Sequence, residues 1–297
     1  MRVLFQGAGA VGIAGAALLI DDHEVAVASR NPRSSAACPE RVRRMRRPQG
    51  PRDRRRVPIV TWETALDFEW DLLVLSTRPS ELDAAVASAI ADLAPPVIAI
   101  TSQVDGDLED ARARFAPAEL VVFSPALLAD RPSGTTVRYW SPPLAPAFLM
   151  AGNRGIERRL HRELGPLVLS VPLPVLLGAP ALLIPYVAEL SVHDGDWEAL
   201  KTHLERPSIA AAEAVRAVTG LPVPGSPLLA RCALEAAENV LPIDVTAYAG
   251  RHFGRHLGQT IAMLEGWTVQ GRARGRAASG AGTMPTLTEL AAVLQAS

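Results

Sequence analysis

The sequence predicts an α/β fold, in which an N-terminal doubly wound sheet is followed by a C-terminal all-helical domain. Short apolar runs alternate with helical stretches up to about residue 125, a GxGxxG motif occupies residues 7–12, and the chain becomes mostly helical after Pro172. Apolar strands separated by helices are typical of a parallel sheet that is covered on both faces. A chain of 297 residues is long enough for two domains.

The N-terminal elements follow one another in a regular order. A buried strand at Val3–Phe5 leads into an alanine-rich helix at Val11–Ile20, and a second strand follows at Glu24–Ala28. Right-handed crossovers between such strands give a doubly wound sheet. We expect further strands at 57–60, 72–76, 97–100 and 120–123, and helices at 80–93 and 108–115.

The pattern changes near residue 130. Residues 135–140 alternate as an edge strand that we expect to pair with 147–151, and a helix at 156–164 precedes a strand at 167–171. We therefore place the domains at 1–172 and 173–297. In the second domain we expect helices at 178–193, 196–204, 208–219, 227–238, 243–267 and 285–295.

Composition argues against several classes of function. The net charge of −1 provides no overall field that would recruit nucleic acid or an anionic membrane. Two cysteines without a CxxC pair argue against a disulfide framework or a cysteine-based zinc site. We count no apolar run of 18 residues and identify no leader peptide, so we expect a cytoplasmic protein without metal, nucleic-acid or membrane partners.

Lysine is almost absent from the sequence. Of the 30 basic residues, Lys201 is the single lysine. A GC-rich genome accounts for such a bias, but the chemical consequence holds whatever its origin. Any mechanism that needs a lysine has one candidate, because arginine stays protonated at working pH and cannot replace lysine as a proton donor.

The stretch 41–56 contains nine arginines in sixteen residues. One interpretation is a solvated loop near a phosphate group, and the other is a nucleic-acid patch. No aromatic residues are interleaved for stacking, so we favour the loop.

The glycine motif follows a strand and opens a helix, which is the context that gives it meaning. Gly7 permits the tight turn, Gly9 lets the backbone approach a pyrophosphate, and Gly12 lets the helix pack closely on the strand. Ala10 and Val11 then present helix N-terminal N–H groups to the phosphates. The motif predicts a Rossmann-type dinucleotide-binding domain at the N-terminus.

The end of the second strand predicts which dinucleotide binds. An NAD site carries an acidic residue there for the ribose 2′-hydroxyl. This sequence instead has Ser29, Arg30 and, three residues further, Arg33. A hydroxyl and two guanidinium groups suit a 2′-phosphate dianion, so we predict NADPH/NADP rather than NADH.

The sequence resembles the ketopantoate reductase (2-dehydropantoate 2-reductase) family. The resemblance lies in GAGAVG at 7–12, HEVAVASR at 23–30, and LVLSTR at 73–78 followed by Asp83-Ala84-Ala85-Val86. An antiparallel excursion before an all-helical domain is also similar. The resemblance implies NADPH-dependent reduction of a ketone on a small 2-oxo acid, in a cleft between a Rossmann domain and a helical domain.

Two loops of the first domain depart from the family pattern. Where the family has a lysine just after the fourth strand, this chain has Thr77 and then Arg78. Where the family has an asparagine-glycine segment near the nicotinamide, this chain has Ser102 and Gln103. We expect all four residues to line the cofactor site.

The second domain departs from the family at its catalytic positions. The family's catalytic lysine falls at Pro185, its two asparagines fall at Glu189 and His193, and its C-terminal glutamate falls near Thr260. Lys201 lies sixteen residues past the lysine position, or roughly 24 Å along a continuous helix, which is too far to substitute for it. We therefore do not expect ketopantoate reduction by the family's residues.

Ketone reduction still needs a proton donor beside the carbonyl oxygen. Tyr186, Glu189 and His193 are spaced by three and four residues, so they share one helix face and are our candidate catalytic residues. Glu189 would orient His193, or act as the acid if burial raises its pKa. The alternative is that these groups are satisfied structurally, and Pro185 is expected to start or kink this helix.

Other candidates are weaker. Ser124 follows the sixth strand, at an edge where open α/β sheets bind ligands. His252 and His256 are four residues apart, but no suitably spaced carboxylate or cysteine completes a metal site, so we favour structural or substrate contacts. Arg251 or Arg255 is a candidate for binding a substrate carboxylate.

The leading hypothesis is an NADPH-dependent reductase of a C=O or C=N bond on a fairly apolar small molecule. The Leu- and Pro-rich second domain and the missing lysine motivate that substrate class. The alternative is an NADP(H)-binding protein without net redox turnover, such as a sensor, a scaffold or a non-redox enzyme. An opine- or imine-forming dehydrogenase is a third option. The sequence does not decide the oligomeric state, and a homodimer is one of the states it allows.

Overall fold

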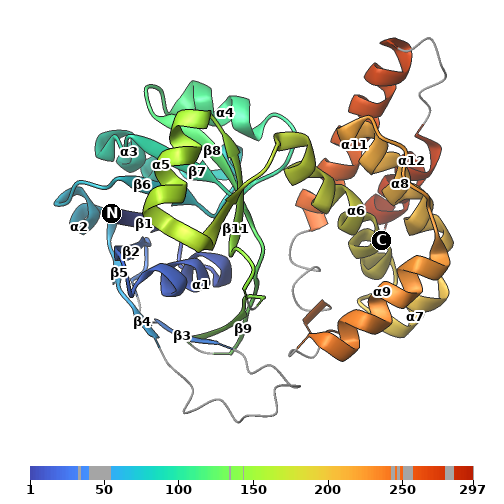
Figure 1. Cartoon of the computed structure of the whole chain (residues 1–297), viewed down its shortest axis with the longest axis horizontal. Helices are drawn as coiled ribbons and strands as arrows, with labels where there is room; N and C mark the ends of the chain where they lie inside the picture. Colours follow the sequence, from blue (N-terminus) through green and yellow to red (C-terminus); the bar gives the residue numbers. More distant parts are fainter. Residues whose placement is uncertain are drawn as a thin grey trace. The chain divides into compact units, whose positions relative to one another are not determined.

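The computed structural model describes residues 1–32, 35–39, 55–133, 135–142, 144–241, 245, 248–249, 257–277 and 284–296. The chain forms two compact units (Figure 1), of which unit 1 ends at Leu173 and unit 2 begins at Pro174. Unit 1 combines sheets with helices, and the described part of unit 2 is helical. The predicted α/β fold with an all-helical C-terminal domain is confirmed for these residues.

Unit 1 is built on an eight-stranded sheet of order β12-β11-β8-β7-β6-β1-β2-β5. Its central strands are apolar and buried along their length, as expected for strands covered on both faces. The pairs from β2 through β1, β6 and β7 to β8 are all parallel. The strands are β1 (Arg2–Gln6), β2 (Glu24–Ala28), β5 (Ile59–Val60), β6 (Leu72–Leu75), β7 (Val97–Ile100), β8 (Glu119–Pro125), β11 (Phe148–Gly152) and β12 (Val168–Ser170).

One predicted strand pairing was wrong, because β10 belongs to a second, four-stranded sheet. Its order is β4-β3-β10-β9, so β10 pairs with β3 and β9. We expected β10 to pair with 147–151, but that segment is β11, which lies between β8 and β12. β11 is apolar and mostly buried, whereas β10 alternates between buried and more exposed residues. The strands are β3 (Ser35–Pro39), β4 (Arg55–Val57), β9 (Leu128–Ser133) and β10 (Thr136–Trp140).

The strand predicted at 57–60 is divided at Pro58. Val57 ends β4 in the small sheet, while Ile59 starts β5 in the large one. Proline has no N–H for a ladder, although the carbonyl of Pro58 still accepts from Val27 N at 2.9 Å.

Helix α1 (Ala10–Leu19) contacts strands of both sheets. Seven of its ten residues are buried, and most of them are small. At Gly15 a Cβ would lie 2.8 Å from the Phe5 ring and 3.1 Å from the Phe148 ring. The small residues therefore let the helix fit closely and fix its N-terminus at the end of β1.

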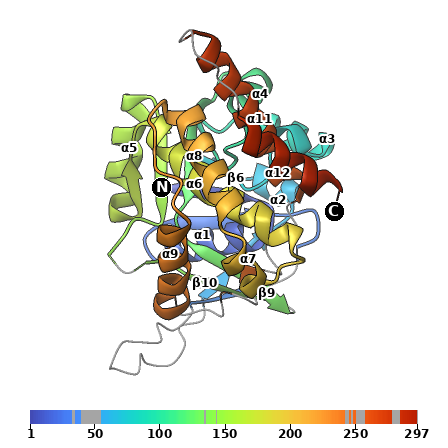
Figure 2. The same ribbon diagram turned by 90° about the vertical axis from the view of Figure 1, so that its right-hand side faces the viewer.

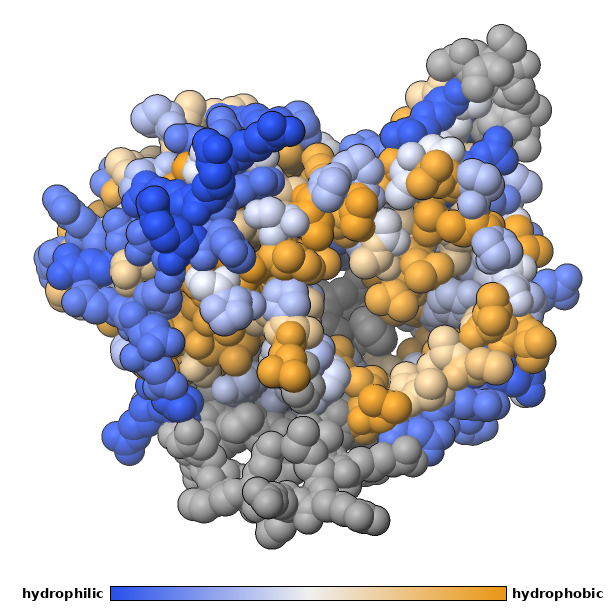
Figure 3. All heavy atoms as spheres, in the orientation of Figure 1, coloured by the Kyte–Doolittle hydropathy of each residue, from blue (hydrophilic) through white to orange (hydrophobic). Residues whose placement is uncertain are grey.

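The remaining helices of unit 1 are α2 (Trp62–Leu66), α3 (Ala84–Leu93), α4 (Asp107–Arg114) and α5 (Arg154–Leu164). The helix predicted at 80–93 is divided into a short 3-10 turn and α3, because the Asp83 side chain accepts from Ala85 N at 2.9 Å and caps α3. α5 buries Ile156, Leu160 and Leu164 on one face, and its outer surface is strongly hydrophilic (Figure 3). The sequence did not predict α2.

Unit 2 contains six helices whose bounds are given in the described part of the chain. α8, α11 and α12 lie side by side (Figures 1 and 2). Part of the predicted helix at 243–267 lies outside the described residues. The helices are α6 (Leu173–Val192), α7 (Trp197–Thr202), α8 (Glu205–Thr219), α9 (Pro227–Val240), α11 (Leu257–Ala277) and α12 (Pro285–Ala296).

Helix α6 differs from its prediction in two ways. It is long and apolar enough to cross a membrane by length and composition alone, with a mean hydropathy of 1.8, so our count of apolar runs was wrong. It also continues through Pro185, where we expected a start or a kink, and through Pro180. Its buried Glu189 forms an ion pair with Arg206 of α8, which is packing typical of the core of a helical domain.

Candidate nucleotide-binding site

The predicted cofactor residues of unit 1 that the structure describes lie at one edge of the large sheet. Because β1, β2, β6, β7 and β8 run parallel, their carboxyl ends meet at the same edge. Ligands of open α/β sheets bind at this edge. The residues there follow β1 (Gly7, Gly9, Ala10, Val11, Gly12), β2 (Ser29, Arg30), β6 (Thr77, Arg78) and β7 (Ser102, Gln103).

Each glycine of the turn after β1 has its own structural reason. Gly7 has φ +85°, which favours glycine, and its N–H donates to the Ala28 carbonyl at 2.9 Å. A Cβ on Gly12 would lie 2.6 Å from the Gly7 carbonyl oxygen, which is closer than real contacts allow. A Cβ on Gly9 would meet nothing within 4 Å, so the space beside Gly9 is open for a ligand.

The N-terminus of α1 faces this open space without a side-chain cap. Gly9 is the N-cap residue, and no side chain bonds to the first turn. The N–H groups of Ala10, Val11 and Gly12 lie in that turn and have no intrahelical acceptors. Together with the helix dipole they are suited to bind an anion, and a dinucleotide pyrophosphate is an anion of this kind.

Hydrogen bonds hold the end of β6 against the end of β1. Thr77 N–H donates to Gln6 Oε1 at 3.1 Å, and Ser76 Oγ donates to the Gln6 carbonyl. The Ser76 hydroxyl also lies beside Gly7, where it leaves no spare room for a side chain. Gln6 and Ser76 are site residues that our sequence reasoning missed, although both are polar residues at the ends of buried strands.

Arg30 lies exposed at the end of β2. Its Nη1 is 3.3 Å from Asp83 Oδ2, and the two side chains are 70% and 46% exposed. Ser29 Oγ accepts from Asn31 N at 3.3 Å. The exposed guanidinium fits a phosphate, which would compete with Asp83 for it. Arg33 and residues 41–54 of the arginine-rich stretch lie outside the described residues.

Asp107 joins the loops after β6 and β7. Its carboxylate is buried and accepts from Arg78 Nε at 3.0 Å and from Arg78 Nη2 at 3.1 Å. Ser102 Oγ donates to the same carboxylate. The hydrogen bonds to Asp107 raise the pKa of Arg78 above its ordinary value. Asp107 therefore brings Arg78 and Ser102 together and links the two loops. The sequence did not point to Asp107.

Gln103 and Ser124 link the carboxyl ends of β7 and β8. Gln103 Nε2 donates to Ser124 Oγ at 2.7 Å. Gln103 Oε1 is buried and has no hydrogen-bond partner among the described residues. Burying a carbonyl oxygen without a hydrogen-bond donor costs free energy, so this oxygen is suited to accept a hydrogen bond from a ligand.

The structure places Glu189 in a buried ion pair of unit 2. The Glu189 side chain is 2% exposed, and its two oxygens accept from Arg206 Nε and Nη2 at 2.8 and 2.9 Å. The hydrogen bonds to Glu189 raise the pKa of Arg206 above its ordinary value. A carboxylate held on both oxygens by a guanidinium acts as an acceptor and is poorly suited to donate a proton.

The other two candidate catalytic residues have different partners. His193 Nε2 lies 3.2 Å from Glu189 Oε1, so these two residues meet on one helix face as predicted. The His193 ring also packs on His203, with ring centroids 4.4 Å apart. Tyr186 instead donates its hydroxyl to Ser208 Oγ of α8 at 3.1 Å. Glu189 and His193 therefore contact each other, while Tyr186 bonds to a different residue of α8.

Lys201 links α7 to α9. Its Nζ lies 2.7 Å from Glu198 Oε1 and 3.0 Å from Glu238 Oε1. The hydrogen bonds to Glu198 and Glu238 raise the pKa of Lys201 above its ordinary value. A lysine that holds its proton more tightly is a weaker acid catalyst.

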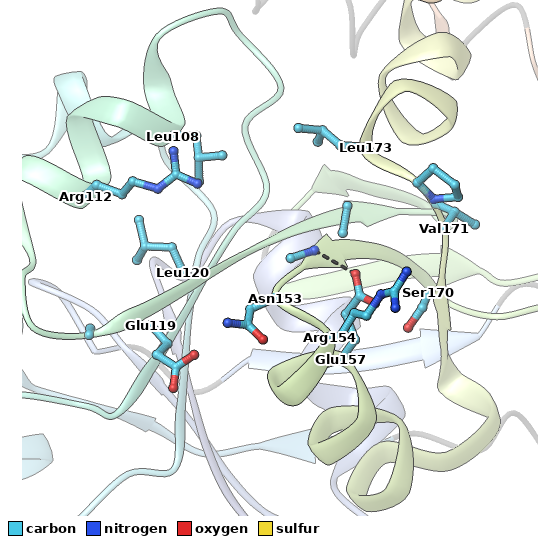
Figure 4. A pocket seen from close by; sticks show the side chains of 14 residues that line it. Leu108, Arg112, Glu119, Leu120, Asn153, Arg154, Glu157, Ser170, Val171 and Leu173 are labelled. Atoms are coloured by element: carbon cyan, nitrogen blue, oxygen red, sulfur yellow. Dashed lines mark hydrogen bonds between the residues drawn. The ribbon is translucent and has the colours of Figure 1, made fainter.

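A cavity of about 710 Å³ lies elsewhere in unit 1 (Figure 4). Glu119 and Leu120, at the start of β8, lie in its wall, which places it away from the carboxyl ends that carry the glycine turn. Asn153 and Arg154 come from the start of α5. None of our predicted site residues lines it. Across the described part of the chain, no group of three or more His, Cys, Asp or Glu side chains is arranged to hold a metal.

Three solved structures of the same fold are named as reductases or dehydrogenases. A probable 2-dehydropantoate 2-reductase from Bacillus subtilis has a TM-score of 0.66 and 17% identity, covering 100% of this chain and 99% of that one. The dimeric ketopantoate reductase from Staphylococcus aureus has a TM-score of 0.64 and 12% identity over the whole of both chains. A D-mandelate dehydrogenase in a ternary structure with NADH and anilino(oxo)acetate has a TM-score of 0.63 and 12% identity, covering 100% of this chain and 97% of that one.

The sequence matches no protein-family model and no curated protein. At 12–17% identity, the likeness to these solved structures shows that the chain shares their fold over its full length. Activity has to be argued from the residues of the site.

Proposed function

We propose that this chain is a divergent relative of the ketopantoate reductases that uses NADPH to reduce a C=O or C=N bond of a small, fairly apolar molecule. The observation that carries the proposal is the glycine turn. Gly7 has a positive φ that favours glycine, and Gly12 leaves no room for a Cβ, while the space beside Gly9 is open at an uncapped helix N-terminus. A turn of this kind after the first strand fits a dinucleotide pyrophosphate.

Arg30 supports NADPH rather than NADH. A D-mandelate dehydrogenase of the same fold contains NADH, so the fold alone does not decide the matter. Arg30 is exposed at the end of β2, where its guanidinium lies 3.3 Å from the exposed carboxylate of Asp83. A dianionic 2′-phosphate would bind a guanidinium in a bidentate manner and outcompete that single exposed pair.

Bound NADPH would supply the hydride, and the chain would hold and orient the reactants. The first turn of α1 would bind the pyrophosphate, and Arg30 would bind the 2′-phosphate. The unpartnered Gln103 Oε1 would accept a hydrogen bond from the ligand, and Ser124 Oγ, which already accepts from Gln103, would be free to donate its proton to a second group. These two residues thus form a polar pair that fits a carboxamide or a substrate oxygen.

The ion pair of Glu189 bears on the choice of substrate. With Glu189 held by Arg206 and no lysine at the family position, the residues described provide a weak source of protons. A protonated C=N bond carries its own positive charge and needs less help from an acid than a ketone does. We therefore propose imines as well as oxo compounds as substrates.

The same observation favours a second candidate function. A protein that binds NADP(H) without net turnover needs the glycine turn and Arg30 but no proton donor. Sensing, scaffolding or a non-redox reaction would all use the site in this way.

Turnover separates the two candidates. The full-length chain is incubated with NADPH and a panel of oxo and imino compounds, and the loss of NADPH absorbance is followed. The reductase proposal predicts many turnovers per protein molecule with at least one substrate. Tight NADPH binding without turnover across the panel would favour the second candidate.

A further inference from the structure

Arg131 contacts the phosphate-binding turn from a distant part of the chain. It lies in β9 of the small sheet, and its Nη2 donates to the carbonyl oxygen of Ala8 at 2.7 Å. Ala8 is the residue between Gly7 and Gly9 in the turn. The contact places a second guanidinium next to the position where the turn is open.

The hydrogen bonding of Arg131 is incomplete. Its Nε is buried and has no partner among the described residues. Leaving a buried, charged N–H without an acceptor costs more than leaving a neutral one, so such groups are rare unless a ligand or a water satisfies them. A guanidinium has five N–H donors, and Ala8 uses one of them.

We infer that Arg131 is a second cation of the nucleotide site, and that it binds the pyrophosphate while Arg30 binds the 2′-phosphate. This inference rests on the proposed function. The forked guanidinium bonds the Ala8 carbonyl with one nitrogen and presents its remaining N–H groups to a phosphate oxygen. The first turn of α1 supplies backbone N–H groups but no full charge, so Arg131 provides the positive charge that a pyrophosphate otherwise lacks there.

Bracing of the turn is the alternative. In that case Arg131 holds the Ala8 carbonyl and never contacts the ligand. The two cases differ in what happens to the guanidinium when the dinucleotide binds: direct contact changes its accessibility, while bracing leaves it as it is.

The first test compares three full-length variants by calorimetric titration. Arg131→Gln, Arg30→Gln and the control Arg138→Gln are titrated with NADP⁺ and with adenosine 2′-monophosphate, which lacks the pyrophosphate. Arg138 is exposed on β10, the strand beside β9, so it matches the change in charge. Melting curves establish that each variant folds.

We expect Arg131→Gln to weaken NADP⁺ binding by about tenfold, or ~1.4 kcal/mol, while binding of adenosine 2′-monophosphate stays within twofold. Arg30→Gln is expected to weaken both ligands, and Arg138→Gln neither. An Arg131→Gln variant that binds NADP⁺ like Arg138→Gln would overturn the inference and leave the proposed function standing. A wild-type chain that binds no NADP⁺ would overturn both.

The second test uses the wild-type chain, so it holds even if Arg131→Gln fails to fold. Phenylglyoxal modifies arginine side chains, and peptide mass mapping reports how fast each one reacts. We expect NADP⁺ to slow the modification of Arg131 severalfold and to leave that of Arg138 unchanged. Equal modification of Arg131 with and without NADP⁺ would show bracing alone and would overturn direct contact.

Discussion

Replacing Glu189 with glutamine tests whether this residue supports the structure of unit 2 or catalyses a reaction. Glutamine keeps the shape of the side chain but removes the charge that faces Arg206. The Glu189 side chain is 2% exposed and the Arg206 side chain 25%, so the pair is largely shielded from water. Breaking a buried pair by removing one partner costs roughly 3–5 kcal/mol.

We expect the lower end of that range, because Arg206 also reaches Glu289 at 3.5 Å and keeps part of its contact with water. A loss of about 3 kcal/mol lowers the melting temperature by roughly 10 °C, at ~3 °C for each kcal/mol. The assay is thermal and urea-induced unfolding at pH 7. The matched control is Glu109→Gln, which breaks the exposed pair with Arg112 and is expected to cost under about 1 kcal/mol.

The refuting result is specific. If the free energy of unfolding of Glu189→Gln lies within about 0.5 kcal/mol of the wild-type value, the change is that of an ordinary surface substitution. Glu189 then does not anchor α6 to α8. If that stable variant also loses turnover while NADPH binding is unchanged, Glu189 is the catalytic acid that the helix spacing predicted.

Arg30→Ala should weaken NADP⁺ binding by about tenfold or more and leave NAD⁺ binding nearly unchanged in calorimetric titrations. An unchanged preference for NADP⁺ over NAD⁺ would show that Arg30 does not bind the 2′-phosphate. Gly12→Ala should abolish dinucleotide binding in the same assay, since its Cβ would lie 2.6 Å from the Gly7 carbonyl, and binding at wild-type strength would show that the turn can move aside. Hydrogen bonding to Lys201 lowers the pKa of Glu238 from its ordinary value of 4.5. The contribution of Glu238 to the free energy of unfolding is therefore complete above pH 4.5, and it is lost as the pH falls through the lowered pKa. Melting curves should therefore show Glu238→Gln less stable than the wild type at pH 7, with a gap that narrows at acidic pH, and a gap independent of pH would contradict the pairing. Lys201→Met should leave turnover within about twofold of the wild type, because Lys201 is bound to two glutamates, whereas a complete loss would make it catalytic.

The sequence predicted several local features of the fold. Apolar runs and glycine spacing, which depend on neighbours along the chain, predicted the strands β1, β2, β6, β7 and β8 and the glycine turn, whereas β3 and β9 were not predicted. β11 was misassigned, since its position between β8 and β12 depends on which distant strands are available to bury its apolar side chains.

Contacts between distant residues could not be predicted in the same way. Asp107 lies 29 residues from Arg78 along the chain, and Arg131 lies 123 residues from Ala8. Glu189 and His193 were correctly placed on one helix face, but their spacing said nothing about Arg206, which comes from another helix. Whether an ionisable group is free to act depends on such partners, which the sequence does not reveal.

We propose above all that NADPH binds at the edge of the sheet that carries the glycine turn and Arg30. Calorimetric titration of the full-length chain with NADP⁺ and NAD⁺ under identical conditions measures this directly. We expect one NADP⁺ to bind per chain, at least about tenfold more tightly than NAD⁺, because the 2′-phosphate adds one charged contact. Binding of neither dinucleotide, or tighter binding of NAD⁺, would contradict it.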